Sequence, residues 1–536
     1  MKKLFCLCLA VIAVLCGGSG ALALSFDNGN AVSYAYTLAA DASWQRVSDP
    51  YLPAGTLCKS APIKGAEDIC YRGGRLYVAD ALNGRIVCIS LATRETRVIG
   101  EDLLQAPAGV FVSRGDEVFV ADPASEKVFV FGRDGGLLRE YPRPADISFG
   151  ADASYKPRKL AVDSAGIITI VSEGNYDGLI QLDKNGKFLG YTGYNNVPVT
   201  LLELIEDKLF TKAQKEKLFR KIPLTFANIA QDEKGINYTL TQGVSGDALK
   251  KHSVGGGNLL GAMHDELNFC DVSVGGTGEI FAVTETGFIF EYDISGDLVF
   301  TFGGYALNSE RNGLITVASG ICADENFNLY VMDKERGIIQ IYTQTPFAAS
   351  YHAGTAQYQN GDYYESFRTF ASLCAQSSGA VFYAYMGKNQ LQLHNYSDAA
   401  AYFKKAGDKD GYSEAYWEVR NSQIGKVLPY AFALIVITLL ASFAAKRVKR
   451  GRDKKKPPVK NRFLRDMRFG FYVLRHPVNA FYDIKLGKAG GVLSASVCYL
   501  LGALIFTVNF FFSGFLWTGI NAAAKTPVLY PVLLFF

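Results

Sequence analysis

Short apolar runs separated by polar, glycine-containing turns fill the chain from about residue 66 to residue 342. One pattern, LYVAD in its clearest form, recurs six times, at residues 76–80, 118–122, 169–173, 238–242, 280–284 and 329–333. Further short apolar runs flank each copy. β-Branched and aromatic residues dominate these runs, so they predict β-strands rather than helices.

Four strands in a repeat of roughly 42 residues is typical of a β-propeller blade, so the sequence predicts an all-β, six-bladed propeller over residues 24–346. Residues 33–38 alternate like a strand but have no blade of their own, and we expect them to close the ring as the outer strand of the last blade. Residues 200–222 predict a helical insertion between blades three and four, either functional or a clip over a blade edge.

The turn after the first LYVAD copy carries a second signature. Asp80, Asn83 and Arg85 belong to the segment DALNGRIV, which resembles the repeat element of NHL propellers. Asp122 and Lys127 keep the same five-residue interval. A carboxylate and a base at this interval can pair across a hairpin, which is a structural role. The resemblance implies a fold and no particular activity.

Beyond Pro346 the spacing of apolar residues changes from one typical of strands to one typical of helices. Six positions recur with an offset of 33, namely Gly354, Gln357, Asp362, Tyr363, Ser366 and Phe370 as Gly387, Gln390, Asn395, Tyr396, Ala399 and Phe403. This resembles tetratricopeptide repeats and implies helical hairpins over residues 347–425. Such an array either binds a partner, with Tyr358, Tyr363 and Tyr396 as candidate contacts, or acts as a rigid spacer.

Residues 427–445 contain no charge over nineteen positions, long enough for a transmembrane helix. The basic linker 446–460 is then cytoplasmic by the positive-inside rule. Residues 1–23 resemble a secretory signal peptide, the alternative being an uncleaved anchor. We therefore expect the propeller and the helical repeats outside the cytoplasm of a multi-pass cell-membrane protein.

The segment from 461 to 536 predicts further membrane helices. Residues 471–485, FYVLRHPVNAFYDIK, resemble the entry of a bacterial Yip-type membrane domain. Only nine residues follow Pro527, too few to cross a bilayer, so we expect a truncated fragment of a longer protein. The combination of domains resembles envelope proteins of Gram-positive bacteria.

The charge distribution bears on nucleic-acid binding, and the cysteine content bears on disulfide formation. The net charge is +4, but residues 446–468 alone hold twelve Lys or Arg against two Asp, so the basic surplus is local and nucleic-acid binding is not expected. Six cysteines lie between the signal and the membrane segment. In an oxidising compartment they form either disulfides or buried free thiols.

Four residues near the starts of the innermost strands, Glu67, Arg158, Asn228 and Asp271, are the candidate ligand site at the channel mouth. They either hold a glycan or small polar ligand or only pair with one another. A divalent cation would require further oxygen ligands where Lys159 stands. We expect no catalytic residue, no metal site and no cofactor.

The sequence thus favours a membrane-anchored, non-enzymatic propeller that senses a ligand or assembles with other envelope proteins. Two alternatives stay open: a metal-dependent, gluconolactonase-like propeller hydrolase, and an accessory subunit of a transporter.

Overall fold

The computed structural model describes most of residues 34–193 and 223–449, together with residue 195 and parts of 466–502. Short gaps fall at residues 60–61, 245, 254, 262 and 308–310. The predicted signal peptide, the insertion 200–222 and the predicted last membrane segment lie outside the described residues. Two compact units, residues 1–382 and 383–536, are described separately.

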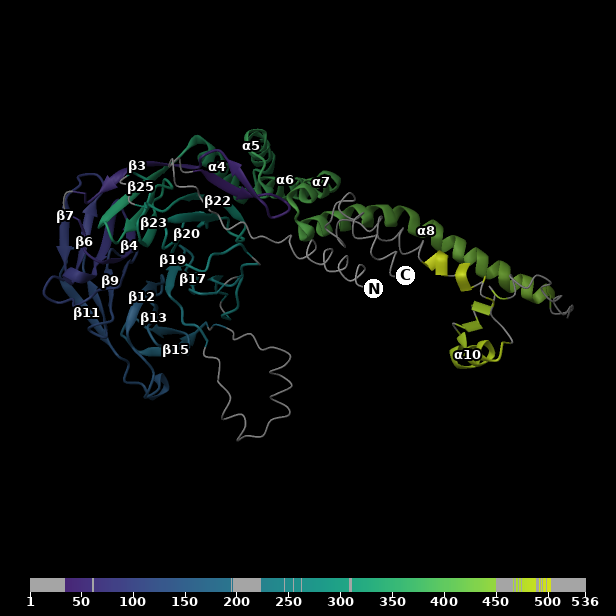
Figure 1. Ribbon diagram of the computed structural model, residues 1–536, viewed down its shortest axis with the longest axis horizontal. Coiled ribbons are helices and arrows are strands. Elements are labelled where there is room, and N and C mark those ends of the chain that lie inside the picture. The colour runs from purple at the N-terminus through teal and green to yellow at the C-terminus, as the bar shows by residue number, and fades with distance from the viewer. Residues whose placement is uncertain are drawn as a thin grey trace, which may run out of the picture. The chain divides into compact units, whose positions relative to one another are not determined.

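The first unit consists mainly of six antiparallel sheets that surround one axis. The innermost strands of the six sheets touch one another in cyclic order, β4–β8–β12–β16–β19–β23, and β23 returns to β4. Figure 1 shows β4, β12, β19 and β23 gathered at the centre and β7, β11 and β15 at the periphery. The predicted six-bladed propeller is therefore confirmed.

Blades one to three each contain four consecutive strands, from the axis outward. Their strands are β4 (Ala66–Arg72), β5 (Arg75–Asp80), β6 (Arg85–Ser90), β7 (Thr96–Ile99), β8 (Gly109–Val112), β9 (Val118–Asp122), β10 (Lys127–Phe131), β11 (Leu137–Pro142), β12 (Pro157–Val162), β13 (Ile168–Ser172), β14 (Leu179–Leu182) and β15 (Phe188–Thr192). Short 3₁₀ turns lie at Ala81–Asn83 and Ile147–Phe149.

Blades four to six depart from this regularity. Their strands are β16 (Asn228–Gln231), β17 (Asn237–Leu240), β18 (Leu249–Lys251), β19 (Phe269–Val274), β20 (Ile280–Thr284), β21 (Phe288–Tyr292), β22 (Leu298–Gly303), β23 (Ala318–Ala323), β24 (Leu329–Asp333) and β25 (Ile338–Gln344). In the described residues blade four has three strands, and blade six has three from its own repeat.

A segment from the N-terminal region of the chain closes the ring, but it is not the predicted one. Strand β3 (Tyr51–Leu57) pairs with β25 as the fourth strand of blade six. The predicted segment instead forms β1 (Ala35–Leu38), which pairs with β22 of blade five and with β2 (Trp44–Val47). Pro53 and Gly55 make β3 read as a loop, yet an outer strand tolerates both because it pairs on one side only.

Aspartates that end the second strands hold the linkers between blades. The carboxylate of Asp80 accepts hydrogen bonds from Arg85 Nε at 3.0 Å and from Asn83, so the pairing predicted for blade one is confirmed. The pairing predicted for blade two is wrong, because Lys127 Nζ lies 2.7 Å from Glu140. The Asp122 carboxylate instead accepts hydrogen bonds from backbone N–H groups, so its acceptor capacity is satisfied without a basic side chain.

Asp122 provides a test of this structural role. Its buried carboxylate accepts backbone N–H bonds from Gln105, Ala106, Ala124 and Ser125. We expect Asp122→Asn to lower the free energy of unfolding by about 2 kcal/mol, because an amide NH₂ then faces N–H donors. Thermal unfolding of the full chain measures the loss. Asp116→Asn, which removes an exposed pair with Arg133, is the control, and equal effects would contradict the assignment.

Two helices follow the propeller within the first unit: α4 (Pro346–Asn360), which packs on it, and α5 (Tyr363–Gln376), which packs on α4. Phe347 and Tyr351 of α4 contact Phe300 of blade five. His352 Nε2 lies 2.8 Å from the buried carboxylate of Glu291. Because a buried hydrogen bond and aromatic contacts both hold α4, this helix is continuous with the propeller.

The second unit begins inside α6 (Ala380–Gln392) and continues with α7 (Tyr396–Ala406) and α8 (Lys409–Lys449). Gly387 of α6 lies against Phe403 of α7, and in the first unit Gly354 lies against Phe370. These contacts agree with the 33-residue offset and confirm the predicted helical region. Membership of the tetratricopeptide family stays a prediction.

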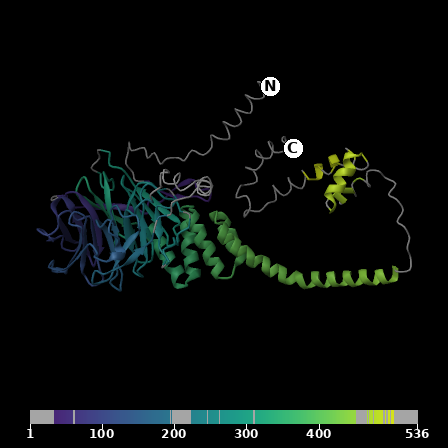
Figure 2. The ribbon, with the colours of Figure 1, turned by 90° about the horizontal axis from the view of Figure 1, so that it is seen from below.

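Helix α8 is the one helix of the described residues long and apolar enough to cross a membrane, by length and composition. Its side chains from Val427 to Phe443 are largely exposed. Figure 2 shows α8 as one continuous helix, and it passes Pro429 without a break. Of the predicted domain 461–536, the structure describes α10 (Pro477–Lys485) and separate helical residues, so further spans and the Yip-type resemblance stay predictions.

Candidate functional site

Six equivalent positions on the innermost strands form a ring around the propeller axis. In five blades this position lies directly opposite the residue that precedes the end of the second strand, and in blade four it lies opposite Leu240, the last residue of β17. We call these residues the axial ring: Asp68, Gly109, Lys159, Asn228, Asp271 and Gly320. The four side chains of the ring are buried.

The polar members of the axial ring bind one another and the backbone of neighbouring blades. Lys159 Nζ lies 2.7 Å from Asp68 Oδ1 and donates to the Glu67 carbonyl at 3.0 Å. Asn228 Nδ2 donates to Asp271 Oδ1. Asp68 Oδ2 accepts from Val110 N at 2.8 Å, and Asp271 Oδ2 accepts from Ile321 N at 2.6 Å. The ring therefore links adjacent blades and, through Lys159, blades three and one with charge-assisted hydrogen bonds.

Glycine fills the two remaining positions because the neighbouring blade leaves no space. A Cβ on Gly109 would lie 2.5 Å from the Arg158 carbonyl oxygen, and one on Gly320 would lie 2.9 Å from Ile69 Cγ2. Inner strands of adjacent blades thus approach closely at these two points. The ring is consequently a tight closure of the axis.

Burial and neighbouring charges shift the pKa values within the ring. Burial raises the pKa of the Asp271 carboxyl to about 7, against the lowering effect of the Lys159 ammonium. Burial alone would lower the pKa of Lys159, but Asp68 and then Asp271 raise it above its usual value. Lys159 is therefore the cation that neutralises this ring, whereas Asp271 changes its charge near neutral pH.

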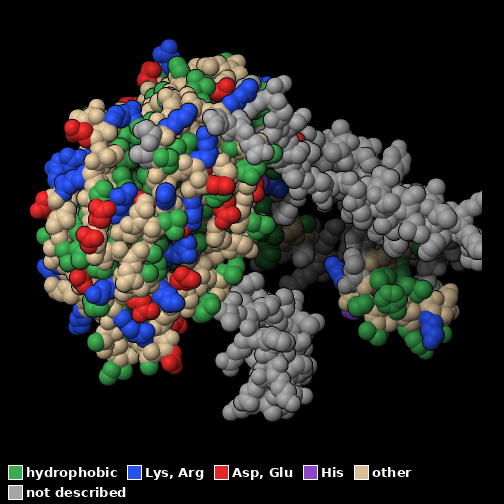
Figure 3. Space-filling view, turned by 60° about the vertical axis from the view of Figure 1, so that its left-hand side comes forward, with side chains coloured by type: hydrophobic (Ala, Val, Ile, Leu, Met, Phe, Trp, Pro, Cys, Tyr) green, Lys and Arg blue, Asp and Glu red, His purple; other side chains and the backbone are tan. Residues whose placement is uncertain are grey.

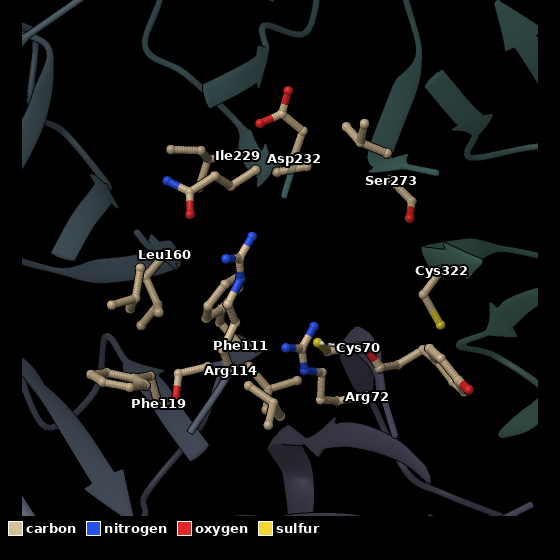
Figure 4. A pocket seen from close by; sticks show the side chains of 18 of the residues that line it. Cys70, Arg72, Phe111, Arg114, Phe119, Leu160, Ile229, Asp232, Ser273 and Cys322 are labelled. Carbon is tan, nitrogen blue, oxygen red and sulfur yellow. Dashed lines mark hydrogen bonds between the residues drawn. The ribbon is translucent and has the colours of Figure 1, made fainter. Parts of the chain in front are cut away.

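A cavity of about 490 Å³ extends from the axial ring to the turns that end the innermost strands. Asp68, Asn228 and Asp271 form its floor. Cys70, Phe111, Leu160, Ile229 and Cys322 line its wall (Figure 4). Three further lining residues stand at or just after the ends of innermost strands, and so nearer the mouth: Arg72, Arg114 and Asp232. An apolar wall with a few polar groups is typical of small-molecule sites, and this volume is within their usual range.

Most aspartates at the mouth are committed to their own turns. The Oδ1 atoms of Asp163, Asp232 and Asp324 each accept backbone N–H bonds from two residues of the following turn, at 2.8–2.9 Å. Such bonds fix a hairpin turn. Glu117 pairs with Arg139 at 2.7 Å.

The wall thiols are not activated nucleophiles. Burial raises the pKa of the Cys70 thiol to about 12 and that of Cys322 well above its usual value. Nucleophilic attack requires the thiolate, so both act as apolar wall groups at neutral pH. None of the six cysteines described in the propeller and first helices forms a disulfide in the structure; Cys88 and Cys322 are buried, as one of the two alternatives expected, and the other four are half-buried.

The four predicted site residues divide into two pairs. Asn228 and Asp271 line the floor of the cavity and bind each other. Glu67 lies 3.5 Å from Arg158 Nη2 and also pairs with Lys334, at the start of the innermost strands and so at the opposite end of the axis from the cavity mouth. All four residues therefore contact one another in pairs, which is the second of the two roles considered for them from the sequence.

The candidate partner-binding tyrosines are divided between the two units. The rings of Tyr358 and Tyr363 lie 5.5 Å apart on the first helical pair. Tyr396 belongs to the second unit, where its hydroxyl lies 2.9 Å from His394 Nδ1. Their binding role stays a prediction.

Several solved β-propellers resemble this fold. A streptogramin B lyase structure aligns over 55% of this chain and 98% of its own, with 12% identity and a TM-score of 0.37. Virginiamycin B lyase from Staphylococcus aureus covers the same shares, with 13% identity and a TM-score of 0.35. A Bacteroides thetaiotaomicron protein of unknown function aligns over 58% of this chain and 76% of its own, with 13% identity and a TM-score of 0.37.

No protein-family model and no curated protein sequence matches the chain. The structural likenesses cover about the length of the propeller, and identities this low carry no argument about a ligand or a reaction. The site must therefore be interpreted from its own residues.

Sequence reasoning missed the cavity because it considered only the starts of the innermost strands. Arg72 and Arg114 stand at or just after the ends of β4 and β8, where each strand enters its first hairpin turn. In each repeat, the residue equivalent to Arg72 and Arg114 can be found in the sequence, because it stands three or four positions before the apolar run of the second strand. These residues lie at the end of the channel opposite to the strand starts from which the candidate site was predicted.

Proposed function

We propose that the protein is a membrane-tethered ligand-binding propeller, which takes a small molecule into the axial cavity and which α8 anchors in the bilayer. The cavity carries this proposal. It combines a polar floor, an apolar wall and two arginines at the mouth. The anchoring role of α8 rests on its length, its apolar composition and its exposed side chains.

The contacts of the axial ring favour binding over metal-assisted hydrolysis. The Lys159 ammonium already lies 2.7 Å from Asp68, where a divalent cation would need that carboxylate as a ligand. Within the described residues, no group of three or more His, Cys, Asp and Glu side chains is arranged to hold a metal ion. The gluconolactonase-like alternative therefore has less support than ligand binding.

The helical pair on the propeller suggests how a bound ligand is reported. Helix α4 is fixed to blade five by His352 and Glu291, and it follows β25 of blade six directly. A ligand that stiffens the blades would act on the first helical pair through these contacts. An assembly with other envelope proteins through the helices belongs to this proposal.

A ligand screen on the full-length chain in nanodiscs tests the proposed function. Compounds that occupy the cavity are expected to raise the midpoint of thermal unfolding of the wild type. Ser273→Phe fills the cavity from blade five and should abolish these shifts, since Ser273 lines the wall. Ser295→Phe, on an exposed turn of the same blade, is the matched control. Shifts that persist in Ser273→Phe would place binding elsewhere and contradict the proposal.

A further inference from the structure

Charged side chains around the cavity are sorted by sign. All four cations of the lining, Arg72, Arg114, Arg139 and Lys184, belong to blades one to three. Carboxylates alone supply the charge on the other half, with Asp232 and Glu233 on blade four and Asp324 and Glu325 on blade six. Figure 3 shows acidic and basic side chains interspersed over one face of the propeller, without such a separation.

The carboxylates of blades one to three do not cancel their cations completely. Asp68 is neutralised by Lys159, and Glu117 by Arg139. Asp163 accepts two backbone N–H bonds within its own turn. These contacts leave Arg72 and Arg114 as the guanidinium groups available to a ligand.

Arg72 is half-buried, and its guanidinium group donates no hydrogen bond to any group in the described residues of the chain. Arg114 donates from Nη2 to the Glu233 carbonyl on blade four, which leaves its other N–H groups unused in the described residues. Figure 4 shows both guanidinium groups directed into the open centre of the cavity. Two such groups at one mouth are suited to a carboxylate, which guanidinium binds in a bidentate manner.

The opposite half offers acceptors. Asp232 Oδ1 is used by its own turn, whereas Oδ2 accepts no hydrogen bond in the described residues, and the exposed Glu233 carboxylate has no such partner there either. Blade four stands diametrically opposite blade one in a six-membered ring, so Asp232 lies across the cavity from Arg72 (Figure 4). An ammonium group is the natural complement of this half.

We infer that the cavity takes a zwitterionic ligand of the amino-acid or short-peptide class. Its carboxylate binds Arg72 and Arg114, its ammonium faces Asp232 and Glu233, and its apolar side chain lies on the wall between them. The inference rests on the proposed function because it concerns the same cavity. A dianion is disfavoured, since the lining holds more carboxylates than cations.

Calorimetry on the full-length chain in nanodiscs with four probes tests the inference. Leucyl-leucine is the zwitterion, N-acetyl-leucine the anion, leucinamide the cation and N-acetyl-leucinamide the neutral control. Leucyl-leucine is expected to bind at least about tenfold more tightly than any other probe. Arg72→Gln should weaken leucyl-leucine roughly tenfold and leave leucinamide unchanged, whereas Arg94→Gln, on an exposed turn of the same blade, should change neither.

The outcomes separate the inference from the proposed function. N-acetyl-leucine or N-acetyl-leucinamide binding as tightly as leucyl-leucine would overturn the inference, as would an Arg72→Gln variant that binds leucyl-leucine normally. If none of the four probes binds while screened compounds shift the wild type and not Ser273→Phe, the inference fails and the ligand-binding propeller stands. If neither probes nor screened compounds bind, both fail.

Discussion

Replacing Lys159 by methionine is expected to lower the free energy of unfolding of the propeller by about 4 kcal/mol. The methionine keeps the apolar length of the side chain but removes the ammonium that lies 2.7 Å from Asp68. The Asp68 carboxylate is then buried without its counter-charge, and the Glu67 carbonyl loses its donor. Breaking a buried pair by removing one partner is far more costly than losing an exposed one.

Thermal and urea unfolding of the full-length chain measure this loss. The exposed Lys156→Met, three residues earlier in the same blade, is the matched control and should stay within about 0.5 kcal/mol of wild type. Adding Asp68→Asn to Lys159→Met should restore some of the stability, because the second change removes the orphaned charge. Additive losses in the double variant would show that the two side chains do not act as a pair.

Asp271→Asn is expected to change the pH dependence of stability. Burial raises the pKa of this carboxyl from 3.8 to about 7, so the folded state binds a proton that the unfolded state has released between those pH values. The contribution of this group to the stability of the wild type is therefore largest below pH 4. As the pH rises from 4 towards 7, the free energy of unfolding falls by up to about 1.4 kcal/mol per pH unit. Asparagine mimics the neutral form and lacks this loss.

Unfolding midpoints of wild type and Asp271→Asn measured from pH 5 to pH 8 test the assignment. The difference between them should shift in favour of the variant as the pH rises to about 7 and then become constant. Asp183→Asn serves as the comparison and should show no shift of this sign, because the backbone N–H groups of Lys187 and Asn185 hold the pKa of the Asp183 carboxyl below its usual value. Parallel curves for wild type and Asp271→Asn would contradict a raised pKa at this site.

The propeller was readable from the sequence because its strands repeat one apolar pattern, and the helical pairs because Gly354 and Phe370 recur at a fixed offset. Local patterns of this kind depend on neighbours in the sequence. The closing strand β3 was not readable, since its Pro53 and Gly55 contradict strand propensity and only the distant β25 makes it a strand. The pairing of Lys127 with Glu140 was not predicted for the same reason, because Glu140 belongs to the neighbouring strand β11.

The candidate site was half predictable. Asn228 and Asp271 were identified because they stand near the starts of the innermost strands. Lys159 was recognised only as an obstacle to a metal, although its contact with Asp68 makes it the centre of the ring. The charge separation at the cavity mouth depends on the angular order of the blades, which no single repeat contains.

The strand that closes the ring also determines where the propeller yields to mechanical load. Gln344, the last residue of β25, pairs with Tyr51 at the start of β3, and the next residue, Thr345, binds the backbone of Asp49 and Pro50. A pull on the chain from the side of α4 reaches this end of the β25–β3 pair first. The hydrogen bonds then break in succession instead of resisting in parallel. Tension from an anchored helical region would open the propeller within blade six, between β25 and β3, while the other five blades keep their strands.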